Sequence, residues 1–340
     1  MTLPPQQQMR RYLFRLLMIP GLLITAAWFW CWEQPMAFMH REYPMWRAKF
    51  DMAKTLAPGS IVIFGDSQAV AGMIPEKLGA DVVNLALGGS TPIEAAALSR
   101  IVLEPGHEPR AVILSFSPLR FLENDYLNRG VHFGLFDLAT VDGVRTRSRK
   151  VHAPDFGPET AYDLDARLKV ALYYARFPSF YYASLRDGRL WTRADANRDI
   201  YRRITESRGH FTFGNQPGCR DLSRDSQLMT FAPSPLIDSY FAEIITLFAE
   251  RGIPVFFISC PLTEQSTAVM PAAFKAEREA FLRQYEALSA SFHVLGDALP
   301  ARPWTEFGDP DHLNVEGARR FSDEVAKLLR TAGVNRAFER

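Results

Sequence analysis

Two short segments that lie far apart in the chain contain the residue types of a serine nucleophile and its base. Gly65-Asp66-Ser67 follows the apolar run 61–64, and Asp309-Pro310-Asp311-His312 stands near the other end of the chain. A serine hydroxyl is a weak nucleophile at neutral pH, so a histidine must take its proton and a carboxylate must orient that histidine. An aspartate three residues before a histidine can fold back and accept a hydrogen bond from the ring. Ser67, His312 and Asp309 are therefore the candidate nucleophile, base and orienting acid.

Taken singly, each of these motifs also has a structural interpretation. Asp and Ser after a strand often cap the next helix. Asp309 and Asp311 could likewise cap a C-terminal helix while His312 packs beside it. The combination is more specific, because both motifs fall at compatible ends of predicted elements and Gly88-Gly89 follows the second predicted strand. We therefore favour one joint site over two helix caps.

The elements that must position these residues alternate between strand and helix. Runs of β-branched or aromatic residues predict four buried strands and a weaker fifth, at 60–64, 81–87, 111–116, 254–259 and 293–295. Helical patterns occupy 92–103, 236–251, 272–289 and 316–329. This order predicts an α/β fold with a parallel sheet covered on both faces. Ser67, Gly88-Gly89 and Ser117 would then lie beyond the carboxyl ends of the strands, where such sheets form their sites.

The N-terminus departs most strongly from the average composition. Residues 16–32 contain no charge, Arg10, Arg11 and Arg15 precede them, and Trp28, Trp30 and Trp32 suit a membrane interface. We expect residues 1–33 to be an uncleaved membrane anchor, with the N-terminus inside and the bulk outside. The alternatives are a cleaved signal peptide and a buried helix, but no small-x-small cleavage site ends the run. The orientation rests on the closer spacing of those arginines, since basic residues also follow the run: Arg41, Arg47 and Lys49.

The rest of the chain divides into a stalk, a body and an insertion. Residues 34–57 predict a stalk helix that packs onto a body comprising residues 58–120 and 230–335. Residues 121–229 break the alternation and predict a mostly helical insertion rich in Tyr, Phe and Arg. The aromatic run 173–182 could stack on sugar rings, although core or docking surface is the more common role of such residues.

Composition excludes several classes of function. The 340 residues are 47% hydrophobic, enough for a sizeable core, and the net charge of +1 gives no bulk attraction to nucleic acid. Three cysteines make no disulfide framework, and Cys219 with Cys260 is the only possible exported pair. The seven histidines show no metal-ligand spacing. We expect no metal and no other cofactor.

Three blocks of the chain together resemble the SGNH (GDSL-type) hydrolase superfamily. They are Phe64-Gly65-Asp66-Ser67, residues 84–89 and Asp309-Pro310-Asp311-His312, spread over about residues 58–120 and 230–335. The resemblance implies a three-layer α/β/α fold of the flavodoxin-like type. It also implies the roles of nucleophile, base and orienting acid for Ser67, His312 and Asp309, and an oxyanion hole built from the N–H groups of Ser67 and of Gly88 or Gly89.

One block departs from the pattern of this superfamily. Its usual Gly-x-Asn-Asp after the third strand is replaced by Ser115-Phe116-Ser117-Pro118-Leu119. Loss of one oxyanion donor typically costs about 2.7–4 kcal/mol of transition-state stabilisation. Either the Ser117 hydroxyl or an amide of another loop replaces the missing Asn, or the protein is slow or inert.

The missing third-block Asn, the anchor and the insertion are together similar to the features of one branch of the superfamily. Its members are exported proteins of polysaccharide or teichoic acid modification, which work beside a membrane-bound O-acyltransferase. The resemblance implies an anchored O-acyltransferase, expected to transfer acetyl, or an esterase that acts on a cell-surface or secreted polysaccharide through a Ser67 acyl-enzyme. The alternatives are a lipid esterase and a catalytically inert assembly factor.

Overall fold

A five-stranded parallel sheet lies at the centre of the molecule. The computed structural model describes residues 5–122, 127–153, 168, 171–177 and 189–333. The sheet runs in the order β2-β1-β3-β4-β6, with β1 (Ile61–Gly65), β2 (Val82–Asn84), β3 (Ala111–Ser115), β4 (Val255–Phe257) and β6 (Phe292–Val294). All five predicted strands are confirmed. A second, two-stranded sheet of β5 (Leu262–Thr263) and β7 (Ala301–Arg302) was not predicted, because strands this short leave no periodic pattern.

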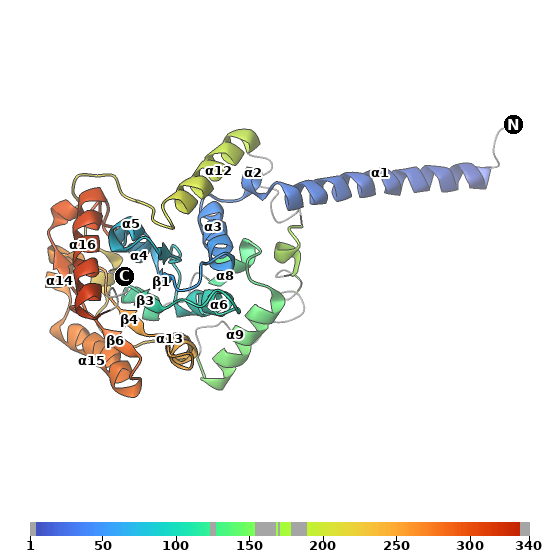
Figure 1. The fold of residues 1–340 in the computed structure, drawn as a ribbon. Helices are drawn as coiled ribbons and strands as arrows, with labels where there is room; N and C mark the ends of the chain where they lie inside the picture. Colours follow the sequence, from blue (N-terminus) through green and yellow to red (C-terminus); the bar gives the residue numbers. More distant parts are fainter. Residues whose placement is uncertain (1–4, 123–126, 154–167, 169–170, 178–188, 334–340) are drawn as a thin grey trace.

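Helices cover both faces of the sheet because successive side chains of each buried strand point to opposite sides. Ile61 and Ile63 pack against one layer, which contains α4 (Ser67–Gly72), α5 (Pro75–Leu78) and α16 (Val315–Thr331). Val62 and Phe64 pack against the other layer, formed by α6 (Pro92–Val102), α13 (Pro235–Ala249) and α15 (Ala272–Leu288). The prediction of an α/β fold with a parallel sheet covered on both faces is confirmed (Figure 1).

The N-terminal helix projects away from the body (Figure 1). It runs as α1 (Pro5–Glu33), and its segment Gln8–Glu33 is long and apolar enough to cross a membrane, with none of its most apolar stretch buried in the protein. This exposure rules out the buried core helix considered above. The base of the helix is held by the body, since Trp28 donates its indole N–H to the Ala175 carbonyl (2.7 Å) and packs edge-on against Phe177.

The segment predicted as one stalk helix forms two helices. They are α2 (Pro35–Phe38) and α3 (Tyr43–Lys54), and each begins with a proline in its first turn, a position that proline favours. Trp46 and Lys49 on α3 are almost completely buried, and the Lys49 ammonium donates to the carbonyl oxygens of Asn84 and Gly209. The hydrophobic core therefore includes this segment and begins well before Pro58.

The described part of the predicted insertion is mostly helical. It includes α8 (Leu127–His132), α9 (Leu138–Lys150) and α12 (Leu190–Glu206), followed by a 3₁₀ turn at Arg224–Gln227. Further short helices elsewhere are α7 (Leu119–Leu122), α14 (Glu264–Val269) and a 3₁₀ turn at Trp304–Glu306. In the aromatic run 173–182, Tyr173 packs on His132 and Phe177 on Trp28, whereas residues 178–182 lie outside the described residues.

Candidate active site

Ser67 is the first residue of α4, directly after the end of β1. A Cβ atom at Gly65 would overlap the Ser115 carbonyl oxygen, so only glycine lets β1 pass so close to β3 at this point. Asp66 caps the helix by accepting a hydrogen bond from the Gln68 N–H (2.9 Å). This sharp strand-to-helix turn places the Ser67 side chain at the carboxyl end of the sheet.

Asp309 holds His312 as the sequence predicted. The Nδ1 atom of His312 lies 2.8 Å and 2.9 Å from the two carboxylate oxygens of Asp309. The same carboxylate accepts the backbone N–H groups of Asp311 (2.9 Å) and His312 (2.8 Å). Burial alone would raise the pKa of Asp309. The hydrogen bond and charge of His312, together with the two backbone amides, outweigh burial and hold this pKa below its usual value. Asn314, rather than either aspartate, caps α16.

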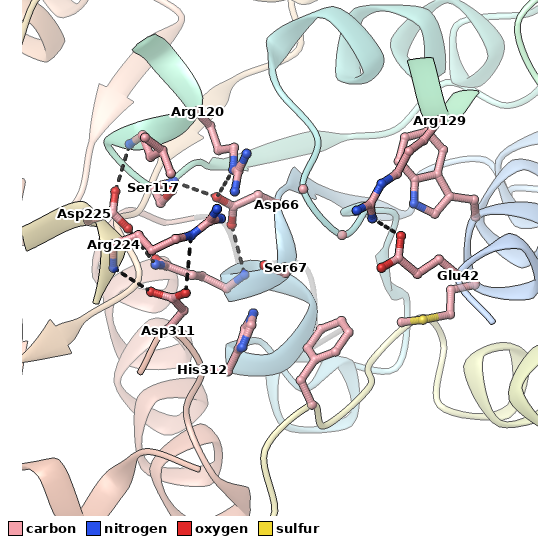
Figure 2. A pocket seen from close by; sticks show the side chains of 17 residues that line it. Glu42, Asp66, Ser67, Ser117, Arg120, Arg129, Arg224, Asp225, Asp311 and His312 are labelled. Atoms are coloured by element: carbon pink, nitrogen blue, oxygen red, sulfur yellow. Dashed lines mark hydrogen bonds and ion pairs between the residues drawn. The ribbon is translucent and has the colours of Figure 1, made fainter. Parts of the chain in front are cut away.

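Ser67 and His312 line the same cavity, which has a volume of about 190 Å³ (Figure 2). No hydrogen bond joins the two side chains, and the buried Nε2 atom of His312 has no partner among the described residues. In the predicted triad this nitrogen would accept the serine proton, and catalytic hydrogen bonds often shorten only when substrate is bound. The cavity opens beside the carboxyl ends of β1 and β3. The strand order reverses between these two strands, and open α/β sheets bind their ligands at such a point.

Three backbone amides at the cavity are candidate oxyanion donors. Ser67, Gly88 and Gly89 all line it, and within the described part of the chain their N–H groups donate to no protein acceptor. Gly89 has a φ of 74°, a conformation that favours glycine. The turn is fixed by Ser90, whose hydroxyl donates to the Gly65 carbonyl (2.7 Å). The geometry leaves both glycines as candidates.

Ser117 also lines the cavity, but its backbone cannot serve as an oxyanion donor. Its N–H group donates to the Asp66 carboxylate (3.0 Å), on which the Arg120 guanidinium also lies at 3.8 Å. Within Ser117, this leaves the side-chain hydroxyl as the group that could replace the missing Asn of the third block. Asp66 thus ties the turn after β1 to the turn after β3, a role that sequence reasoning missed because it depends on strand pairing.

A buried acidic network lies behind Ser67. Asp225 accepts hydrogen bonds from the Leu119 N–H (2.8 Å) and the Gln68 side chain (3.3 Å), and Ser223 links it to Asp311 through a 2.6 Å hydrogen bond. Burial, with smaller contributions from the charges of Asp66 and Asp311, raises the pKa of Asp225 to about 6, although the Leu119 amide opposes the shift. Asp225 lies in the predicted insertion, and its sequence surroundings give no sign of this position.

The pKa of Asp225 predicts that this residue makes the fold less stable as the pH rises. A carboxyl group with a raised folded-state pKa stabilises the fold below its unfolded pKa, near 3.8, and this contribution disappears as the pH passes about 6. The expected loss between pH 4 and pH 7 is about 2 kcal/mol. Urea unfolding of wild type and Asp225→Asn at both pH values measures it, since the variant lacks the titration. An equal pH dependence in the two proteins would contradict the assignment.

The segment after α12 packs on the loop that contains His312. The Phe213 ring lies 4.7 Å from the His312 ring, centroid to centroid. Gly214 and Gly308 come so close that a Cβ atom on either would overlap the backbone of the other. Sequence reasoning did not find this contact, because the two glycines are far apart in the chain and each looks like an ordinary loop residue.

We expect Gly308→Ala to lower kcat by about 100-fold, because displacement of a catalytic loop by about 1 Å has an effect of that size. The loop must move away from Gly214, and His312 moves with it. Gly143→Ala on α9 is the matched control, since a Cβ atom there meets no atom within 4 Å. Ester hydrolysis is measured with both variants; equal activities would show that the close packing does not position His312.

The remaining residues considered in the sequence are the cysteines and the possible metal ligands. Cys219 and Cys260 are both free and buried. Burial raises the pKa of Cys260 to about 12, and its sulfur lies 3.4 Å from the Ser115 hydroxyl, so it is a packing residue. Among the described residues, no group of three His, Cys, Asp or Glu side chains is placed to hold a metal ion.

Comparison with protein-family models, with curated proteins and with solved structures gives no match to this chain.

Proposed function

We propose that this chain is a membrane-anchored, serine-dependent O-acyltransferase or esterase, expected to handle acetyl groups, that acts on a polysaccharide. One observation supports it above the others. His312 is held by Asp309 through its Nδ1 atom, and it presents an unpartnered Nε2 atom in the cavity that Ser67 lines. This is the arrangement by which a histidine activates a serine hydroxyl.

The reaction proceeds in two balanced steps. Ser67 Oγ attacks the acyl carbonyl while His312 Nε2 takes its proton, and the same proton then goes to the departing alcohol oxygen. An acceptor hydroxyl next attacks the Ser67 ester, passes its proton to His312 and leaves with the acyl group, and the proton returns to Ser67. In both steps the N–H groups of Ser67 and of Gly88 or Gly89, which line the cavity and donate to no acceptor in the described part of the chain, would stabilise the negative carbonyl oxygen.

The strand order supports the superfamily resemblance. Numbered along the chain within the main sheet, the order β2-β1-β3-β4-β6 is 2-1-3-4-5, the order of flavodoxin-like folds. Ser67 follows the first strand and His312 precedes the last helix, in the places that the resemblance implies. We therefore propose an SGNH-like body.

The anchor supports an extracytoplasmic location. Arg10, Arg11 and Arg15, in the first turns of α1 ahead of its apolar stretch, favour a cytoplasmic N-terminus, which leaves the body in the periplasm or outside the cell. The last turns of α1 pack on the body through Trp28 and Cys31, which argues for an uncleaved helix. The proposed partner, by resemblance, is a membrane-bound O-acyltransferase that passes acyl groups outward.

Two observations bear on the alternatives. The cavity is small and has few apolar lining residues, mainly Met45, Trp46, Leu119 and Phe213, which disfavours a long fatty acyl chain and therefore a lipid esterase. The occupied Ser117 amide favours the inert assembly factor, because it removes one possible substitute for the missing Asn. The three amides without a protein acceptor and the oriented histidine favour the enzyme.

A cellular experiment separates the enzyme from the assembly factor. Wild type and Ser67→Ala are expressed in cells that lack the native copy, and the acyl content of the cell's polysaccharide is measured together with the amount of polymer. The proposal predicts normal polymer without acyl groups in the Ser67→Ala strain. Full acylation in that strain would establish an inert assembly role.

A further inference from the structure

The catalytic cavity extends beyond Ser67 to a wall that no part of the acyl-transfer step uses. Glu42, Met45 and Trp46, from the end of the α2–α3 turn and from α3, line this wall together with Arg129 of α8. Figure 2 shows the Glu42–Arg129 pair on the side of Ser67 away from Asp225 and Asp311. We propose that this wall is the subsite for the acyl acceptor and that it binds an uncharged, hydroxyl-bearing sugar; this inference rests on the proposed function.

The first argument is the chemistry of the wall. Trp46 is 1% exposed, and its indole N–H has no hydrogen-bond partner among the described residues although a buried indole usually finds one. Glu42 can only accept hydrogen bonds, and Arg129 can only donate them. A sugar ring presents neighbouring hydroxyl groups that both accept and donate, next to C–H faces that suit an aromatic side chain. Such a ligand can accept a hydrogen bond from the indole N–H and donate one to the Glu42 carboxylate.

The second argument is the charge of the cavity. Each lining arginine is paired with a carboxylate: Arg120 with Asp66, Arg129 with Glu42, and Arg224 with Asp311. Asp225 also lines the cavity, and its pKa of about 6 makes it mainly ionised at neutral pH. Carboxylates therefore outnumber guanidinium groups, four to three, among the described lining residues. A polymer of uronic acids or of phosphodiesters would meet repulsion here, whereas a neutral glycan would not.

The third argument is the position of the wall relative to the anchor. Glu42 follows the last residue of α1, Glu33, by nine residues, so their Cα atoms lie within about 30 Å even if the chain between them is fully extended. The α2 turn shortens this reach further. A glycan chain that emerges at the membrane would therefore meet this wall beside the anchor, within reach of Ser67.

The test is direct binding, measured by titration calorimetry on the full chain in detergent. All proteins contain Ser67→Ala to prevent turnover, and the probes are a neutral gluco-oligosaccharide and an oligogalacturonate of equal length. We expect tighter binding of the neutral probe. We expect Trp46→Phe, which keeps an aromatic ring against Phe133, to weaken it about three- to tenfold through the lost donor.

Glu42→Gln gives a second test that does not disturb the core, because this side chain lies near the surface. The substitution removes one negative charge, so the oligogalacturonate should bind more tightly and the neutral probe less tightly. Trp191→Phe and Glu250→Gln, both at exposed positions, are the matched controls and should change neither affinity. The inference is overturned if the acidic probe binds more tightly to the protein with the native wall, or if neither wall variant changes binding. Failure of the proposed function would appear separately, as absence of acyl transfer in the protein that retains Ser67.

Discussion

Replacing Ser67 with alanine is expected to reduce ester hydrolysis and acyl transfer by about 10⁴- to 10⁶-fold, the range found when a serine nucleophile is removed from a catalytic triad. In the proposed mechanism Ser67 forms the covalent intermediate, and among the described residues no other hydroxyl stands at the N-terminus of α4 beside His312. The change in kcat with an acetyl ester measures the effect.

A double variant tests whether Ser67 and His312 act as one catalytic unit. Residues that act as one catalytic unit are strongly non-additive, so Ser67→Ala combined with His312→Ala should lose scarcely more activity than either single variant. Ser239→Ala, which removes a remote hydroxyl on α13 that donates to the Leu236 carbonyl, is the matched control and should retain full activity. Multiplicative losses in the double variant would mean that Ser67 and His312 act independently.

Asp309→Asn is expected to lower kcat by about 10⁴-fold with little change in KM. The Asp309 carboxylate accepts hydrogen bonds from the Nδ1–H of His312 and from two backbone N–H groups. Asparagine would turn an N–H₂ group toward the ring or toward these amides. The ring would then favour the tautomer with its proton on Nε2, which cannot accept the proton of Ser67.

A matched control for this change is Asp323→Asn. Asp323 is an exposed carboxylate on α16 that pairs with Lys77, and surface pairs of this kind contribute little to stability. Its activity should equal that of the wild type. An Asp309→Asn protein with more than a tenth of the wild-type kcat would show that the carboxylate does not orient the base.

The pairing of Asp309 with His312 and the place of Ser67 after a strand could be predicted from sequence because both depend on local geometry. Ser67 follows an apolar strand directly, and Asp309 and His312 are three residues apart, so short-range geometry brings the carboxylate to the ring. The strands could be predicted for the same reason, since each is a short β-branched or aromatic run with clear boundaries.

The rest of the site depends on contacts between distant segments, and no local pattern marks these. Trp46 was expected on a stalk, but it lies in the core and lines the cavity because α3 packs beside the sheet. Asp225 and Phe213 come from a segment interpreted as an insertion. Their positions follow from the tertiary fold, which one sequence does not specify at this level of detail.

The central claim is that Ser67 forms an acyl-enzyme. The full chain in detergent should be treated with an acetyl ester, quenched in acid and digested, and the peptide that contains Ser67 should be examined by mass spectrometry. We predict one added acetyl group on Ser67, absent from His312→Ala and removed when a neutral oligosaccharide is added, with the acetyl group recovered on the sugar. An unmodified Ser67 peptide under quenching times from milliseconds to minutes would contradict the account.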